Sequence, residues 1–129
     1  MQADMKWRSR FDGSHVTDER DLQRLGVRDR LTVAGAYVSE ASLRAYLRAA
    51  DAIALPYLST WWESSATARD AIASGRPVIT SSALAFLDLG GAVFRVSAGF
   101  PLERAIELVL TRPALAAELV EAGRRLAER

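Results

Sequence analysis

The feature that most constrains the fold of this chain is the alternation of short, mainly apolar runs with longer amphipathic stretches. Such runs occupy residues 31–34, 52–55, 78–80 and 92–96. Apolar runs without polar alternation are typical of strands that are covered on both faces. Strands separated by helices form parallel sheets with right-handed crossovers. The sequence therefore predicts an α/β fold, with an open parallel sheet and flanking helices.

Amphipathic helices are predicted between the apolar runs. Ser39 can cap a helix in which Leu43, Tyr46 and Leu47 recur at helical spacing on one face. Gly75 stands where a left-handed residue commonly ends a helix. Further helices are expected over residues 18–25, 64–74, 102–110 and 113–127.

Composition narrows the class of protein. Seventeen basic residues nearly balance sixteen acidic ones, so no large basic surface for nucleic acid is expected. The chain has no cysteine and a single histidine, His15, so neither a disulfide scaffold nor a metal site is expected. No apolar stretch approaches the roughly 20 residues that cross a bilayer. We expect a cytoplasmic, metal-free protein with no transmembrane segment, in which residues 1–16 form an irregular lead-in and residues 17–129 one domain.

The richest candidate site follows the second apolar run, because ligands of open parallel sheets bind beyond the carboxyl ends of the strands. The chain reads PYLSTWWESSATARDAIASG at this place. Ser64 and Ser65 lie at the start of a predicted helix, where unpaired N–H groups favour an anion such as phosphate. Glu63 and Asp70 are seven residues apart and would share one helix face, where both could hold hydroxyls of a ribose and a sugar.

Each of these residues also has a purely structural interpretation. Residues 63–65 equally fit an ordinary N-cap with an acid in the first turn. Asp70, taken alone, fits a solvated helix residue, and Arg69 fits a solvated residue as well as a ligand of a diphosphate. Trp61 and Trp62 could stack on a base, cover the surface of the domain or face a partner. Spacing alone does not decide between these interpretations.

The order of these pieces resembles the C-terminal, donor-binding half of family 4 glycosyltransferases, which have the GT-B fold. The resemblance rests on three stretches, LGVRDRLTVAGAYVSEASLRAYLRAADAIALPY, ESSATARDAIASGRPVIT and RAIELVLTRPALAAELVEAGRRLAER. In that family the second stretch carries two acids on a helix that ends in an A-x-G-x-P-V-I pattern. The resemblance implies a Rossmann-like fold and transfer of a sugar from a nucleoside-diphosphate-sugar, with neither metal ion nor cofactor.

The resemblance also implies a role for individual residues of the donor site. The residues assigned to this site are Tyr37, Glu63, Ser64, Ser65, Ala66 and Asp70. Asp70, which stands where the family has a glutamate, would hold the ribose, and Glu63 would contact the donor sugar. Backbone N–H groups of residues 64–66 would face the diphosphate, and Tyr37 would lie along the base.

The family's acceptor-binding domain and the first strands of its donor domain have no counterpart in this sequence. Those strands supply the cations that stabilise the leaving diphosphate, so the chain is expected to supply only a helix N-terminus. No residue is assigned a catalytic role, and a missing N-terminal acceptor domain is an expected partner. Three alternatives stay open: a non-catalytic nucleotide-binding or partner-docking module, possibly half of a split glycosyltransferase; self-association through an exposed sheet edge; and a flavodoxin-like signalling domain.

Overall fold

The computed structural model divides the chain into two compact units, Met1–Glu40 and Ala41–Arg129. It describes residues 23–26, 28–31, 38–56, 66–97 and 99–129. In the first unit, a helical turn ends at Gly26, whose φ is 71°, and the 3₁₀ helix η1 covers Arg28–Arg30. The predicted lead-in, most of the helix over 18–25 and residues 32–34 of the first apolar run lie outside the described residues.

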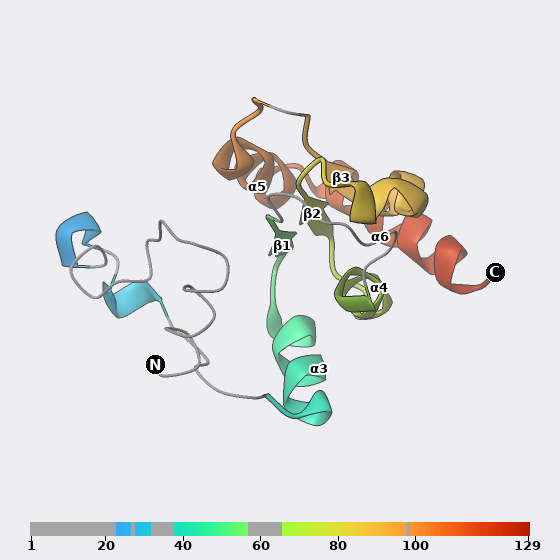
Figure 1. Cartoon of the computed structure of the whole chain (residues 1–129), viewed down its shortest axis with the longest axis horizontal. Helices are drawn as coiled ribbons and strands as arrows, with labels where there is room; N and C mark the ends of the chain where they lie inside the picture. Colours follow the sequence, from blue (N-terminus) through green and yellow to red (C-terminus); the bar gives the residue numbers. More distant parts are fainter. Residues whose placement is uncertain (1–22, 27, 32–37, 57–65, 98) are drawn as a thin grey trace. The chain divides into compact units, whose positions relative to one another are not determined.

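The second unit is a parallel sheet with flanking helices, shown in Figure 1. Its elements are α3 (Glu40–Ala49, which begins at the unit boundary), β1 (Ile53–Leu55), α4 (Ala66–Ala73), β2 (Val78–Thr80), η2 (Leu84–Ala92), β3 (Phe94–Arg95), α5 (Leu102–Thr111) and α6 (Pro113–Ala127). The strand order is β1-β2-β3, and β2 pairs parallel with both neighbours. The predicted α/β class and parallel sheet are therefore confirmed for the described residues.

Local signals set the ends of the helices. Gly75 adopts a φ of 80° directly after α4, and its N–H donates to the Ile72 carbonyl at 3.2 Å. Glycine adopts this left-handed conformation at little cost, so the predicted stop is confirmed. Pro113 occupies the start of α6, where its missing N–H leaves no intrahelical bond unmade.

Two apolar faces differ from the prediction. Leu47 of α3 and Ala50 directly after it pack against the core as predicted, whereas Tyr46 of the same predicted face is 59% exposed. The prediction that the strands are covered on both faces is confirmed for β2, whose three residues are all buried. It is wrong for β1, where Ala54 is exposed beside the buried Ile53. Ala54 lies on the face of β1 opposite Ile53, and the described residues of the other core cluster do not include it.

The segment between β2 and β3, for which the sequence analysis gives no secondary structure, forms η2. Gly90 interrupts this 3₁₀ helix with φ 53° and ψ −132°, a combination that a side chain strongly disfavours. Because η2 extends to Ala92, β3 is shortened to Phe94–Arg95 from the predicted run over 92–96.

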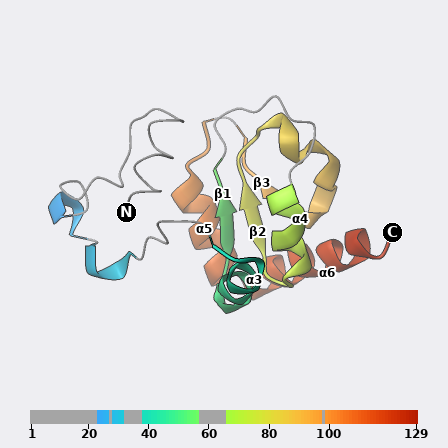
Figure 2. The same cartoon turned by 60° about the horizontal axis from the view of Figure 1, so that its bottom comes forward.

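The core consists of two clusters, one on each face of the sheet. The α4-side cluster joins Ile53 and Val78 to residues of α4 and η2, including the almost fully buried Phe86. The α5-side cluster joins Ile79 and Val96 to residues of α5 and α6. Figure 2 shows β1, β2 and β3 side by side, with α4 in front of the sheet and α5 behind it. The sheet is thus the middle layer of this unit.

Candidate functional site

The candidate site lies at the carboxyl ends of the three parallel strands. Leu55 pairs in register with Thr80, and Thr80 with Arg95, so these three residues form the last row of the sheet. Ile53 and Val78 pair two residues earlier and belong to the α4-side cluster. Because side chains alternate between faces along a strand, the side chains of the last row lie on the α4 face of the sheet.

Helix α4 points its amino end toward this edge. It follows β1 in the chain and leads through Gly75 and Pro77 to the amino end of β2, where the Ile53 N–H donates to the Pro77 carbonyl at 3.0 Å. The carboxyl end of α4 is therefore at the amino edge of the sheet, and its amino end is at the carboxyl edge, as Figure 2 shows. The helix dipole places partial positive charge at that end.

Two of the six assigned donor-site residues are described, and both are on α4. Ala66 is its first residue and Asp70 follows one turn later, both exposed. Buried Ala68 and Ile72 mark the core face of α4; at 100° per residue, Asp70 falls on the side away from the core. Tyr37, Glu63, Ser64 and Ser65 lie outside the described residues, as do Trp61 and Trp62.

Arg69 is engaged in an ion pair. Its Nη2 lies 2.5 Å from Oδ2 of Asp88, with side chains that are 51% and 42% exposed. The pair connects α4 to η2, and solvent screening keeps the contribution of such an exposed pair small. The ion pair adds a structural role for Arg69 to the two interpretations that the sequence left open.

The loop after β2 is held by short hydrogen bonds. Thr80 is fully buried, and its Oγ1 donates to the Ser81 carbonyl at 2.9 Å. The Ser81 N–H donates to the Leu55 carbonyl at 3.2 Å, which continues the strand pairing into the loop. Ser82 follows, and it is exposed at the edge.

Arg95 is a residue of this edge that the sequence prediction missed. Its Nη2 donates to the Ser82 carbonyl at 3.2 Å, and its side chain is exposed. It is the only charged residue in the described strands and in the described loops that follow their carboxyl ends. The prediction did not single out Arg95, because it lies inside an otherwise apolar run. The signal that the sequence offered was the presence of this one charged residue in an apolar strand.

The described residues also form hollows elsewhere on the second unit. A shallow one of about 270 Å³ is lined by Gly90 and Gly91 of η2 and by Ala122, Arg125 and Leu126 of α6, among others. It adjoins the end of η2, directly before the amino end of β3, and so lies away from the strand carboxyl ends. We take the carboxyl ends of the strands as the candidate site, because ligands of open parallel sheets bind there.

The described part of the chain shows neither of two other features, a metal site or a membrane-spanning helix. No group of three or more His, Cys, Asp or Glu side chains there could hold a metal ion. Nor does any helix in that part have the length and apolar character needed to cross a membrane.

Comparison with protein-family models, with curated protein sequences and with solved structures finds no match to this chain.

Proposed function

We propose that this chain is the donor-binding portion of a nucleotide-sugar glycosyltransferase, with a Rossmann-like fold of the GT-B type. The observation that carries the proposal is α4, whose amino end points to the carboxyl edge of a parallel sheet and which exposes Asp70 one turn later. A nucleoside-diphosphate-sugar at this edge would meet the positive end of a helix and a carboxylate at a spacing that suits a diphosphate and a ribose. Tyr37 and residues 63–65 complete the proposed site.

In the proposed reaction, an acceptor oxygen forms a bond to the sugar C1 while the bond from C1 to the diphosphate oxygen breaks. The diphosphate leaves with the electron pair, and its developing charge needs stabilisation by positive groups. Asp70 accepts hydrogen bonds from the ribose hydroxyls and so fixes the donor, and the amino end of α4 faces the diphosphate. In this proposal an acceptor-binding domain would hold the acceptor and supply the base that takes its proton.

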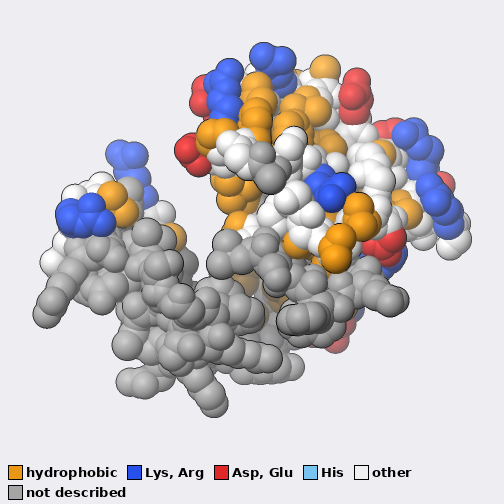
Figure 3. All heavy atoms as spheres, turned by 45° about the horizontal axis from the view of Figure 1, so that its top comes forward, with side chains coloured by type: hydrophobic (Ala, Val, Ile, Leu, Met, Phe, Trp, Pro, Cys, Tyr) orange, Lys and Arg blue, Asp and Glu red, His pale blue; other side chains and the backbone are white. Residues whose placement is uncertain are grey.

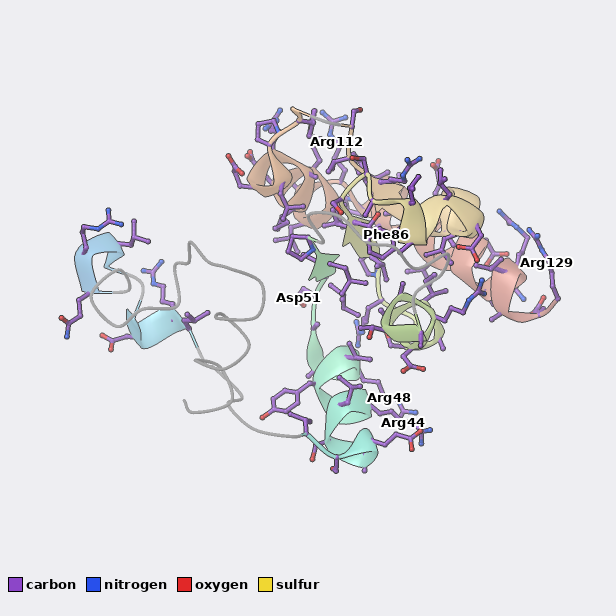
Figure 4. The ribbon with its side chains drawn as sticks, in the orientation of Figure 1. Arg44, Arg48, Asp51, Phe86, Arg112 and Arg129 are labelled. Carbon is purple, nitrogen blue, oxygen red and sulfur yellow. The ribbon has the colours of Figure 1, made fainter. Side chains whose placement is uncertain are left out.

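The direct test is a two-dimensional amide NMR titration of the chain with UDP, GDP, ADP and TDP. We expect saturable shifts at Ala66–Ala73, with one base preferred. Asp70→Ala should weaken binding about tenfold, because a hydrogen bond to a charged group contributes about 1.5 kcal/mol. Asp51→Ala is the matched control, since Asp51 precedes β1 at the amino edge of the sheet and is also exposed (Figure 4).

Two results would reject the proposal on a folded protein. One is the absence of saturable shifts with every nucleotide, and the other is equal loss of affinity in the Asp70 and Asp51 variants.

A partner-docking module is the second candidate, and it rests on a different observation. Leu84 and Leu87 of η2 are 62% and 55% exposed, and Figure 3 shows a face on which apolar side chains are exposed between charged ones. Self-association is the simplest form of docking, and light scattering after size-exclusion chromatography measures it. A monomer at every concentration would contradict self-association.

A further inference from the structure

We propose that Arg95, together with the loop at Ser82, forms the subsite that holds the diphosphate of the donor. This inference rests on the proposed function, and it adds a residue that neither the motif spacing nor the family resemblance assigns. It also revises the expectation that the chain supplies only a helix N-terminus to the leaving group.

Position is the first argument. Arg95 closes the last row of the sheet, on the face that also carries α4. The amino end of α4 lies at the same carboxyl edge. A cation and the positive end of a helix dipole are therefore on the same face of the sheet at the same edge. An anion placed there would meet both positive groups.

The bonding of Arg95 is the second argument. A guanidinium has five N–H donors in a planar fork, and the Ser82 carbonyl at 3.2 Å accepts from Nη2. No carboxylate among the described residues forms an ion pair with Arg95. Donors therefore remain for two phosphate oxygens, and the fork geometry suits bidentate contact with phosphate.

The local sequence gives the third argument. Strand β3 and its neighbours read Val93-Phe94-Arg95-Val96, and the partner of Arg95 in the register is the fully buried Thr80. An aliphatic side chain at position 95 would satisfy the pairing of the strand equally well. A cation at this position instead leaves a positive charge at the edge where the diphosphate would leave, and where it would stabilise the electron pair on the departing oxygen.

A purely structural alternative is that Arg95 only fixes the loop through Ser82, and the test is designed to separate the two. The probe is inorganic pyrophosphate, titrated into the full chain and followed by amide NMR at constant ionic strength, with uridine as the uncharged ligand. We expect saturable shifts at Ser82, Arg95 and Ser97 and a shift of the Arg95 Nε–H resonance. Loop fixation alone predicts no Nε–H shift.

Substitutions give the second readout. Arg95→Gln should weaken pyrophosphate binding about tenfold, because a charge-assisted hydrogen bond is lost. Arg95→Lys keeps the charge but loses the fork, so its loss should be smaller, about threefold. Arg112→Gln removes the same charge between α5 and α6 and should change the affinity less than twofold (Figure 4). Uridine binding should be unaffected by all three changes.

The two proposals fail in different ways. If the nucleotides bind in an Asp70-dependent way but Arg95→Gln leaves pyrophosphate binding unchanged, the subsite is rejected and the proposed function stands. If no nucleotide binds but pyrophosphate shifts the Arg95 Nε–H resonance, the subsite stands and the glycosyltransferase proposal falls. If pyrophosphate produces no saturable shift at Arg95, the subsite is rejected. The Nε–H resonance is measured on the unsubstituted chain, so this result does not depend on whether Arg95→Gln folds.

Discussion

Gly123, in the middle of α6, is a residue whose missing side chain matters for packing. A Cβ there would lie 2.9 Å from Cγ2 of Ile72, a branched side chain of α4 that cannot easily move aside. Gly→Ala within a helix normally stabilises by about 1 kcal/mol, but overpacking costs about 1–3 kcal/mol. We therefore expect Gly123→Ala to lower the free energy of unfolding by about 1 kcal/mol in urea denaturation.

Gly91→Ala is the matched control for this packing prediction. A Cβ at Gly91 would meet Ala122 Cβ at 4.0 Å, an ordinary contact. This variant should be close to neutral. A Gly123→Ala protein that is more stable than the wild type would show that α4 and α6 can separate without cost.

Individual site residues can be predicted from the sequence only where they lie within a recognisable motif. Asp70 is recognised because its helix, its stop at Gly75 and the apolar run before it form a known order, and the structure places it on the exposed side of that helix. Arg95 is not recognised, because no motif contains it and its partner Ser82 is 13 residues away in sequence. Its position depends on strand register, which a single sequence does not fix.

Among the elements, α6 carries a network of ion pairs that depends on pH. Arg124 donates from Nε and Nη2 to the Glu121 carboxylate, at 3.1 and 2.6 Å, and this hydrogen bonding holds the pKa of Glu121 below its usual value. A carboxyl whose folded pKa is depressed stabilises the helix above its ordinary pKa of about 4.3, and this contribution is lost as the pH falls through the folded value. We expect the last turns of α6 to fray in acid.

Hydrogen exchange of the amides at 122–127, compared between pH 6 and pH 3 after correction for intrinsic rates, measures this effect. Glu121→Gln should lose most of the acid dependence, whereas Glu118→Gln, an exposed residue of the same helix, should keep it. Since both partners are about half exposed, added salt should weaken the difference. Equal acid sensitivity in the two variants would contradict the assignment to Glu121.

How well the elements can be predicted depends on how local their signals are. The bounds of α6 agree with the prediction because Pro113 and a regular apolar stripe both lie within the helix. The 3₁₀ helix η2 was not predicted, because its residues are mostly apolar without a helical period and its bend depends on Gly90. The exposure of Ala54 likewise depends on which segments pack on that face of β1, a long-range property.

At the scale of the whole sheet unit, the two clusters share β2 and α6, so we expect the unit to unfold in one transition. Phe86 is 1% exposed in the α4-side cluster, and truncation of a buried aromatic costs about 3–5 kcal/mol. Phe86→Ala should lower stability by that amount for probes on both faces of the sheet, followed by NMR during urea denaturation. Leu87→Ala, at a neighbouring position that is 55% exposed, should cost less than about 1 kcal/mol.

Separate midpoints for the two faces in Phe86→Ala would contradict the single transition and would show that the clusters are independent.

Helix α6 packs with both core clusters, and this also determines when a newly made chain can fold. Leu119 belongs to the α5-side cluster and Leu126 packs against the α4-side cluster. A ribosome adds about 5–20 residues per second, so the strands emerge seconds before the helix that contributes to both core clusters. Until α6 leaves the exit tunnel, both clusters lack this partner, and during that interval the nascent chain is most exposed to chaperones and to aggregation.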